Sequence, residues 1–310
     1  MKKIVFLDEY SIAGRSLDKI TSQGEYVAYE NTKKEDVVER LRGAEIAITN
    51  KVVIDGEAMR QLPDLKLICI AATGMNNVDL EAAKELGIEV KNAVGYSTTS
   101  VAETTITSAL ALARNVVYFN EYFHDGRYAK ADRAFCYDRH TFQISGKKWG
   151  IVGMGNIGRE VARLASAFGC EVRYFSTSGV KREEQYPAME LEELLKWSDI
   201  VSIHSPLNER TRGLIGRNEL RLMKPSALII NVARGGIIDE AALAEALDNG
   251  TIAAAALDVF SVEPLRESPL YNIKDKYRLL ASPHNAWSAA EAIDRLIECV
   301  AENIRVWLAK

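Results

Sequence analysis

The amino-acid sequence predicts an α/β protein with two doubly wound, parallel-sheet domains. Short apolar runs alternate with longer amphipathic stretches along the chain, which is typical of parallel strands joined by helices. A length of 310 residues exceeds one ordinary hydrophobic core and also predicts two domains. A helix expected over residues 289–308 returns the chain to the first domain. We therefore expect a discontinuous first domain, residues 1–100 and 285–310, around an inserted domain of residues 101–284.

Each strand is expected at a short apolar run, and each helix where apolar residues recur every three or four positions. Residues 100–118 are rich in alanine and contain no Gly or Pro, so one long helix should carry the chain out of the first domain. The strands expected in the first domain are Lys3–Leu7, Ile46–Thr49, Leu67–Ala71 and Glu89–Asn92, and the helices are Lys34–Arg42, Asp55–Gln61 and Leu80–Leu86.

The inserted domain repeats the same alternation. Its expected strands are Lys148–Val152, Glu171–Phe175, Ile200–His204, Ala227–Val232, Ala253–Val259 and Leu279–Ser282. Its expected helices are Arg159–Phe168, Leu191–Lys196 and Glu240–Asn249.

Composition excludes several classes of function. The apolar fraction of 47%, the charged fraction of 26% and the net charge of −4 indicate a soluble protein without general attraction to nucleic acid or anionic membranes. No apolar run is long enough to span a bilayer, and the N-terminus predicts a strand instead of a signal peptide. The four cysteines form no CxxC pair, and the four histidines lack ligand spacing, so we expect a reducing cytoplasm and no metal site.

A glycine-rich turn follows the expected strand that ends at Val152. Its sequence, Gly153-Met154-Gly155-Asn156-Ile157-Gly158, has the spacing of a dinucleotide-binding fingerprint between a strand and a helix. Gly153 would allow the tight turn, Gly155 the approach of a pyrophosphate and Gly158 close helix packing. This motif predicts Rossmann-like or flavodoxin-like domains and a bound nucleotide, although a tight turn without a ligand has the same glycines.

The end of the next expected strand bears on the choice between NAD and NADP. An NAD site usually carries Asp or Glu there, which binds the adenosine ribose. Here Ser176, Thr177 and Ser178 stand in that place, followed by Lys181 and Arg182. Hydroxyls and cations favour a 2′-phosphate, so the sequence favours NADP or the use of both cofactors. An ordinary polar loop that contacts only the ribose is the alternative.

Three polar residues follow successive apolar runs: Arg234, Glu263 and His284. A histidine in such a loop can protonate a carbonyl oxygen, and a carboxylate partner favours the imidazolium form. A guanidinium can bind a substrate carboxylate in two prongs. Each residue alone fits a surface role, but together they predict hydride transfer to a 2-keto acid or from a 2-hydroxy acid.

At these residues the chain resembles the D-isomer-specific 2-hydroxyacid dehydrogenases over nearly its whole length. The resemblance implies that Arg234 binds and polarises the substrate, that Glu263 supports the histidine, and that His284 is the acid/base. It places Asp258 at the nicotinamide carboxamide and Thr105 near the cofactor phosphates. The stretches that carry the resemblance are Gly153–Gly158, His204–Leu207 with Thr211, Asn231–Asp239, Ala256–Phe260 with Glu263-Pro264, and Ser282–His284. The further cofactor contacts that the resemblance implies are His204, Pro206, Thr211, Val232, Ala233 and Ala286.

The resemblance also implies a substrate loop, a subgroup and a partner. The backbone of Thr73, Gly74 and Met75 would meet the substrate carboxylate across a closing cleft, and the segment from Ser100 onward resembles an arm that forms homodimers. Ala286-Trp287 and residues 174–178 are most similar to glycerate dehydrogenases, or hydroxypyruvate reductases. Trp287 suits a small substrate, or else packs at a hinge. Lys51 could bind an anionic substituent, or simply be an exposed lysine.

Other substrates and other functions remain open, both within the dehydrogenases and outside them. Pyruvate, a bulkier 2-keto acid and 3-phosphohydroxypyruvate are alternative substrates, although the chain ends at Lys310 without an added regulatory domain. Glu263 argues against a formate-oxidising relative, which carries Gln at that position. A non-catalytic NAD(H)-sensing scaffold has the same fold, but this chain shows no polar flanks to recruit partners.

Overall fold

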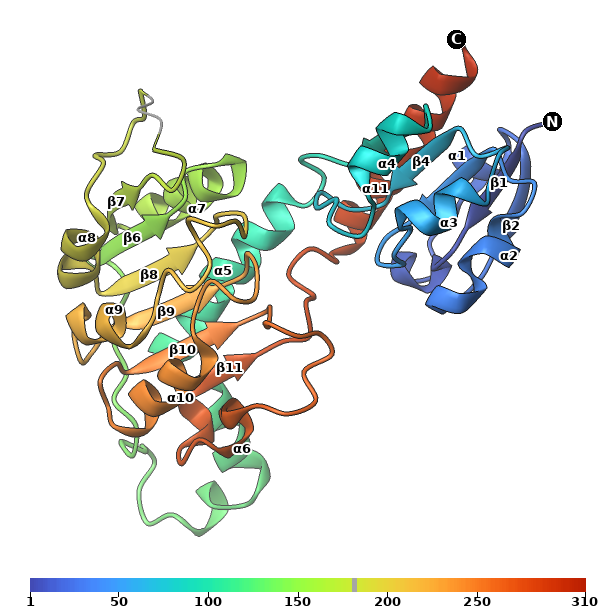
Figure 1. Cartoon of the computed structure of the whole chain (residues 1–310). Coiled ribbons are helices and arrows are strands. Elements are labelled where there is room, and N and C mark those ends of the chain that lie inside the picture. The colour runs from blue at the N-terminus through green and yellow to red at the C-terminus, as the bar shows by residue number, and fades with distance from the viewer. Residues whose placement is uncertain (180–182) are drawn as a thin grey trace. The chain divides into compact units, whose positions relative to one another are not determined.

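The computed structural model describes residues 1–179 and 183–310 and divides into two compact units (Figure 1). The first unit consists of Met1–Ser97 and Ser288–Lys310, and the second consists of Thr98–Trp287. Each unit holds one fully parallel sheet with helices on both faces. The predicted fold class is therefore confirmed.

The five-stranded sheet of the first unit has the order β2-β1-β3-β4-β5. Its central strands β3 and β4 are buried along their whole length because helices cover both faces. α2, α3 and α4 pack on one face, and α11 lies against β4 with α1 beside it. The strands are β1 (Lys3–Phe6), β2 (Glu25–Ala28), β3 (Ile46–Thr49), β4 (Leu67–Ile70) and β5 (Glu89–Asn92), and the helices are α1 (Asp18–Thr21), α2 (Val37–Leu41), α3 (Gly56–Arg60), α4 (Leu80–Glu85) and α11 (Ala290–Leu308).

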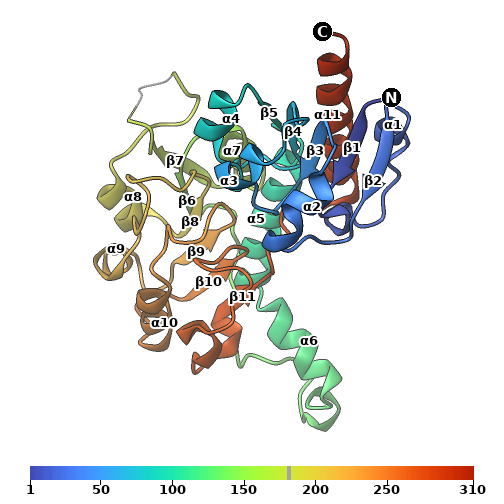
Figure 2. The ribbon, with the colours of Figure 1, turned by 45° about the vertical axis from the view of Figure 1, so that its right-hand side comes forward.

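The six-stranded sheet of the second unit has the order β11-β10-β9-β8-β6-β7 (Figure 2). α5 and α7 pack on the face that carries Trp149 and Ile151, while α8, α9 and α10 pack on the face that carries Val152 and Ile203. The strands are β6 (Lys148–Val152), β7 (Glu171–Phe175), β8 (Ile200–Ile203), β9 (Leu228–Asn231), β10 (Ala254–Leu257) and β11 (Leu279–Ala281), and the helices are α5 (Thr98–Ala113), α6 (Val116–His124), α7 (Asn156–Ala167), α8 (Leu191–Trp197), α9 (Arg217–Leu222) and α10 (Glu240–Asp248).

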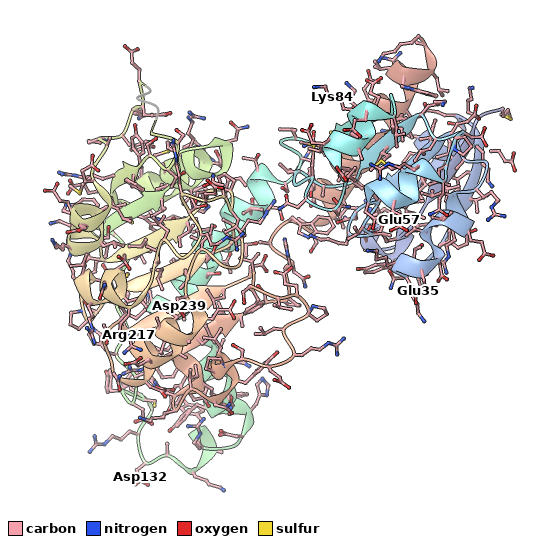
Figure 3. All side chains as sticks on the ribbon, in the orientation of Figure 1. Glu35, Glu57, Lys84, Asp132, Arg217 and Asp239 are labelled. Carbon is pink, nitrogen blue, oxygen red and sulfur yellow. The ribbon has the colours of Figure 1, made fainter. Side chains whose placement is uncertain are left out.

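The prediction of one helix over residues 100–118 is wrong, because the chain forms two helices there. Asn115 separates α5 from α6 and adopts a left-handed conformation with φ of 50°. Asparagine tolerates that conformation better than most residues. Its side-chain amide donates to the carbonyl oxygen of His140 at 2.9 Å, which fixes the turn against the returning chain. α6 then leads away from the sheet, and Asp132 lies at the far end of the segment that follows it (Figures 1 and 3).

Smaller differences also separate prediction and structure, among them the short helices α1 and α9, which were not predicted. The edge strand β2 was not predicted, and the expected helix Lys34–Arg42 begins as a 3-10 turn, Lys34–Asp36, before α2. Both lie where little apolar surface is buried: β2 is half-exposed, and the 3-10 turn has no buried residue.

Candidate active site

Arg234, Glu263 and His284 follow three strands that are neighbours in the second sheet. Arg234 comes after β9, Glu263 after β10 and His284 after β11. Since the carboxyl ends of parallel strands meet at one edge, three consecutive loops present these side chains on the same edge of the sheet. This is the edge on which open α/β sheets bind their ligands.

His284 and Glu263 form a hydrogen-bonded pair. Nδ1 of His284 lies 2.7 Å from Oε2 of Glu263, and the two side chains are 24% and 33% exposed. The other carboxylate oxygen of Glu263 accepts the backbone N–H of Phe260 at 3.0 Å. The pair therefore fixes the ring through Nδ1 and leaves Nε2 without a hydrogen bond to any described residue. In this partly exposed side chain, Nε2 is the atom that can exchange a proton with a bound substrate.

The loop that carries His284 is held by the buried carboxylate of Asp258. Its oxygens accept the hydroxyl of Ser282 at 2.5 Å and the backbone N–H groups of Asn285 and Ala286 at 2.8 and 2.9 Å. Burial raises the pKa of Asp258. The backbone N–H of His284 also donates to the Asp258 carbonyl at 2.7 Å. In the structure both carboxylate oxygens bind groups of the histidine loop, and the cofactor contact that the resemblance implies for Asp258 stays a prediction.

A second anchor of the same loop comes from helix α5. The carbonyl oxygen of Ala286 accepts the hydroxyl of Ser100 at 2.6 Å and that of Thr104 at 3.4 Å. Ser100 lies 186 positions before Ala286 in the chain. The sequence offered no local signal for this contact. Together, Asp258 and Ser100 hold Ala286 by both its N–H and its carbonyl oxygen.

Arg234 is half-buried in a loop that packs on the Glu263 loop. The side chain of Asn231 clamps the Arg234 loop, donating to the Arg234 carbonyl at 2.9 Å and accepting the N–H of Ala233 at 3.0 Å. A Cβ on Gly235 would overlap the carbonyl group of Phe260. Only glycine therefore allows this approach of the two loops. Arg234 makes no ion pair within the described part of the chain, so its guanidinium can bind a substrate anion.

The glycine-rich turn has the shape that a pyrophosphate requires. Gly153 has a φ of 98°, and its Cβ would lie 2.9 Å from the backbone nitrogen of Ser205. A Cβ on Gly158 would overlap the carbonyl oxygen of Gly153. At Gly155, by contrast, a Cβ would meet no atom within 4 Å. Gly155 caps α7, with Asn156 and Ile157 in its first turn, so open space lies beside the free N–H groups of a helix.

His204 and Ser205, directly after β8, add buried polar atoms to this turn. Nδ1 of His204 and the hydroxyl of Ser205 are buried and have no hydrogen-bond partner among the described residues. The indole N–H of Trp149 donates to the hydroxyl of Ser202 at 2.9 Å, and that hydroxyl lies 2.9 Å from Nε2 of His204. Burial lowers the pKa of His204 to about 3, so the ring is neutral. Unpartnered buried polar atoms beside open backbone fit a nucleotide ligand.

Other residues expected at the cofactor make contacts within their own segments. The buried hydroxyl of Thr105 donates to the Val101 carbonyl at 2.8 Å, one helical turn earlier. Thr211 closes its loop by donating to the Pro206 carbonyl at 2.6 Å. Val232 is buried and Ala233 is partly buried, both in the Arg234 loop. Lys181 and Arg182 lie outside the described residues.

The residues expected to bind substrate from the first unit follow two neighbouring strands of its sheet. Thr73, Gly74 and Met75 follow β4, and Lys51 follows β3. The carboxylate of Asp8, which is fully buried, accepts the N–H groups of Asn50, Lys51 and Val52 at 2.8, 2.6 and 3.2 Å. Asp8 therefore fixes the backbone that carries Lys51. Trp287, the last residue of the second unit, packs on the core cluster around Trp149.

Comparison with known proteins identifies the family of this chain. Residues 106–286 match the family model of the D-isomer specific 2-hydroxyacid dehydrogenase, NAD binding domain. The chain belongs to this family. The family resemblance, the dehydrogenase class and the use of NAD or NADP that the sequence predicted are thereby confirmed.

Three relatives illustrate the similarity. The chain is 39% identical to a glycerate dehydrogenase of Methylorubrum extorquens, over 99% of this chain and 96% of the relative. It is 33% identical to a hydroxypyruvate reductase of Blautia hydrogenotrophica, over 99% and 97%. The crystal structure of an NADPH-dependent glyoxylate/hydroxypyruvate reductase from Sinorhizobium meliloti, with NADP and malonate, superimposes with a TM-score of 0.85 at 25% identity, covering 100% of this chain and 94% of that one.

The described residues contain neither a candidate membrane-spanning helix nor a candidate metal cluster. No helix there has both the length and the apolar character needed to cross a membrane. No group of three or more His, Cys, Asp or Glu side chains within residues 1–179 and 183–310 is arranged to hold a metal ion.

Proposed function

We propose that this protein reduces hydroxypyruvate and glyoxylate to the corresponding 2-hydroxy acids, with NADPH or NADH as the reductant. The observation that carries the proposal is the 2.7 Å pair of His284 and Glu263 on the sheet edge that also presents Arg234. The names of the glycerate dehydrogenase and hydroxypyruvate reductase relatives support the choice of substrate. The D configuration of the product rests on the family.

In this mechanism, the nicotinamide cofactor supplies the hydride when it is bound. Arg234 binds the substrate carboxylate in two prongs and polarises the adjacent carbonyl group. His284 gives the proton on Nε2 to the carbonyl oxygen, and takes it back in the reverse direction. Glu263 holds the ring through Nδ1 and stabilises the imidazolium by its opposite charge. The backbone N–H groups of residues 73–75 contribute to carboxylate binding.

Several residues would hold the cofactor. The open backbone at Gly155 and the start of α7 would receive the pyrophosphate, and His204 and Ser205 offer unpartnered polar atoms beside it. Ser176 and Ser178, whose hydroxyl oxygens lie 3.3 Å apart at the end of β7, favour NADP or the use of both cofactors. Lys51 would favour a substrate with a polar or anionic substituent. The four free cysteines suit a reducing compartment such as the cytoplasm.

The segment from α6 to residue 143 supports a homodimer. It carries large exposed side chains, namely Phe123 (62% exposed), Phe135 (74%) and Tyr137 (86%). Apolar surface of this kind is commonly covered by another subunit. We expect the segment of one copy to bind a second copy of the chain.

Initial rates of NADH and NADPH oxidation with hydroxypyruvate, glyoxylate, pyruvate and 3-phosphohydroxypyruvate test the proposal. Hydroxypyruvate should be reduced fastest, and His284→Ala should lose about 100- to 10,000-fold in turnover while cofactor binding is kept. Arg234→Lys should also fail, because an ammonium cannot make a two-pronged contact. Arg221→Ala, in the exposed last turn of α9, is the control because it lies outside both the candidate site and the α6 segment. Normal turnover of His284→Ala, or inactivity of the wild-type protein with all four acids, would contradict the proposed function.

A further inference from the structure

The loop after β8 brings a guanidinium to the end of β7. Nη1 of Arg210 donates to the carbonyl oxygen of Ser178 at 3.0 Å, and it would lie 3.4 Å from a Cβ on Gly179. β7 is the edge strand beside β6, which carries the glycine-rich turn (Figure 1). From this geometry we propose that Arg210 is the specificity-determining residue that binds the 2′-phosphate of NADPH. The inference rests on the proposed function and names the residue behind its cofactor preference.

The position of Arg210 matches the adenosine end of a dinucleotide site. In this fold the residues that follow the second strand lie at the adenosine ribose, where an acid binds the two ribose hydroxyls of NAD. Residues 176–179 contain no acid, and the hydroxyls of Ser176 and Ser178 lie 3.3 Å apart there. Arg210 adds a positive charge from a different loop. Hydroxyl donors and a guanidinium are the groups that bind a phosphate monoester best.

The loop that carries Arg210 is held in place by its neighbours. The backbone N–H of Arg210 donates to the side chain of Asn208 at 2.9 Å, and the N–H of Asn208 donates to the hydroxyl of Thr211 at 2.8 Å. Thr211 is fully buried and bonds to the Pro206 carbonyl. The base of the side chain is therefore fixed, while the exposed guanidinium is accessible to a ligand.

The charges near this loop leave Arg210 available for a phosphate. Arg210 forms no ion pair with any residue that the structure describes. Glu184, on the chain that returns to β7, has both carboxylate oxygens bound by Arg159, at 2.5 and 3.0 Å. Its negative charge is therefore largely compensated. Glu209, the chain neighbour of Arg210, is exposed and screened by solvent, so it weakens phosphate binding only slightly.

Arg210→Ala, with Arg212→Ala as the matched control, tests this inference. Arg212 is also exposed and belongs to the same loop, and its side chain forms no hydrogen bond or ion pair with residues 176–179 of the described chain. NADPH and NADH affinities are measured by fluorescence titration without substrate, and kcat/KM is measured for both cofactors with hydroxypyruvate. Arg210→Ala should weaken NADPH binding by about 10- to 100-fold and leave NADH binding within about twofold. Arg212→Ala should change neither the NADPH nor the NADH affinity. Arg210→Lys should bind NADPH more tightly than Arg210→Ala does, but less tightly than the wild-type protein.

The two measurements separate the inference from the proposed function. Equal losses for NADPH and NADH, no loss for either, or a wild-type protein that binds only NADH would overturn the role of Arg210. A selective loss of NADPH binding in a protein that reduces none of the four acids would support Arg210 and contradict the proposed reaction.

Discussion

The contact between Gly235 and Phe260 joins the Arg234 loop to the Glu263 loop, and a single methyl group should separate them. In Gly235→Ala the new Cβ would lie 2.5 Å from the backbone nitrogen of Ser261 and would overlap the Phe260 carbonyl group. Real Cβ atoms keep at least 3.0 Å from such atoms, so the loops must move apart by about 1 Å. Backbone cannot yield as a flexible side chain does. A misplacement of about 1 Å in a catalytic group costs roughly 100-fold in turnover.

We therefore expect Gly235→Ala to lower kcat by about 100-fold and to cost about 1–3 kcal/mol in free energy of unfolding. The kcat comes from NADPH oxidation with hydroxypyruvate, and the unfolding free energy comes from urea titration. Gly236→Ala is the control: φ there is 77°, but the nearest atoms are side-chain carbons of Leu207 at 3.8 Å. It should cost about 1–2 kcal/mol in backbone strain and leave kcat nearly unchanged. Wild-type kcat in folded Gly235→Ala would refute the idea that this contact aligns Arg234 with the Glu263–His284 pair.

Two further predictions concern buried titratable groups. Asp258→Asn replaces one acceptor oxygen with a donor that faces a backbone N–H, so it should cost about 1.5–3 kcal/mol in urea titration and lower kcat more than cofactor affinity; unchanged kcat would show that the histidine loop does not need this carboxylate. Burial lowers the pKa of His204 from 6.5 to about 3, so between these values the unfolded chain binds more protons than the folded one. Above pH 6.5, His204 should not lower the free energy of unfolding. Below pH 6.5, that free energy should fall by about 1.4 kcal/mol per pH unit. His204→Gln should flatten this slope in urea titrations from pH 7 to 4, and an unchanged slope would contradict the assignment.

The fold could be predicted where burial determines local structure. Strands such as β3 and β9 are buried on both faces, so they appear in the sequence as unbroken apolar runs. β2 escaped prediction because it is a half-exposed edge strand, and its Tyr26 and Val27 leave only a weak apolar pattern. The break at Asn115 escaped because the residues before it favour a helix and no Gly or Pro marks the turn. What decides the break is the bond from Asn115 to His140, 25 positions later.

The candidate site shows the same division between local and distant information. Arg234, Glu263 and His284 were predictable because each polar residue follows directly after an apolar strand, and the edge of a parallel sheet gathers such positions. The residues that align these three could not be predicted from the sequence. Ser100 reaches Ala286 from another part of the chain, and Asp258 binds the His284 loop only because β10 pairs with β11. Sequence pattern thus identifies the groups that we propose perform the chemistry, whereas strand pairing determines which residues hold them. Arg210 follows the same rule, because its loop reaches the end of β7 across the intervening strand β6.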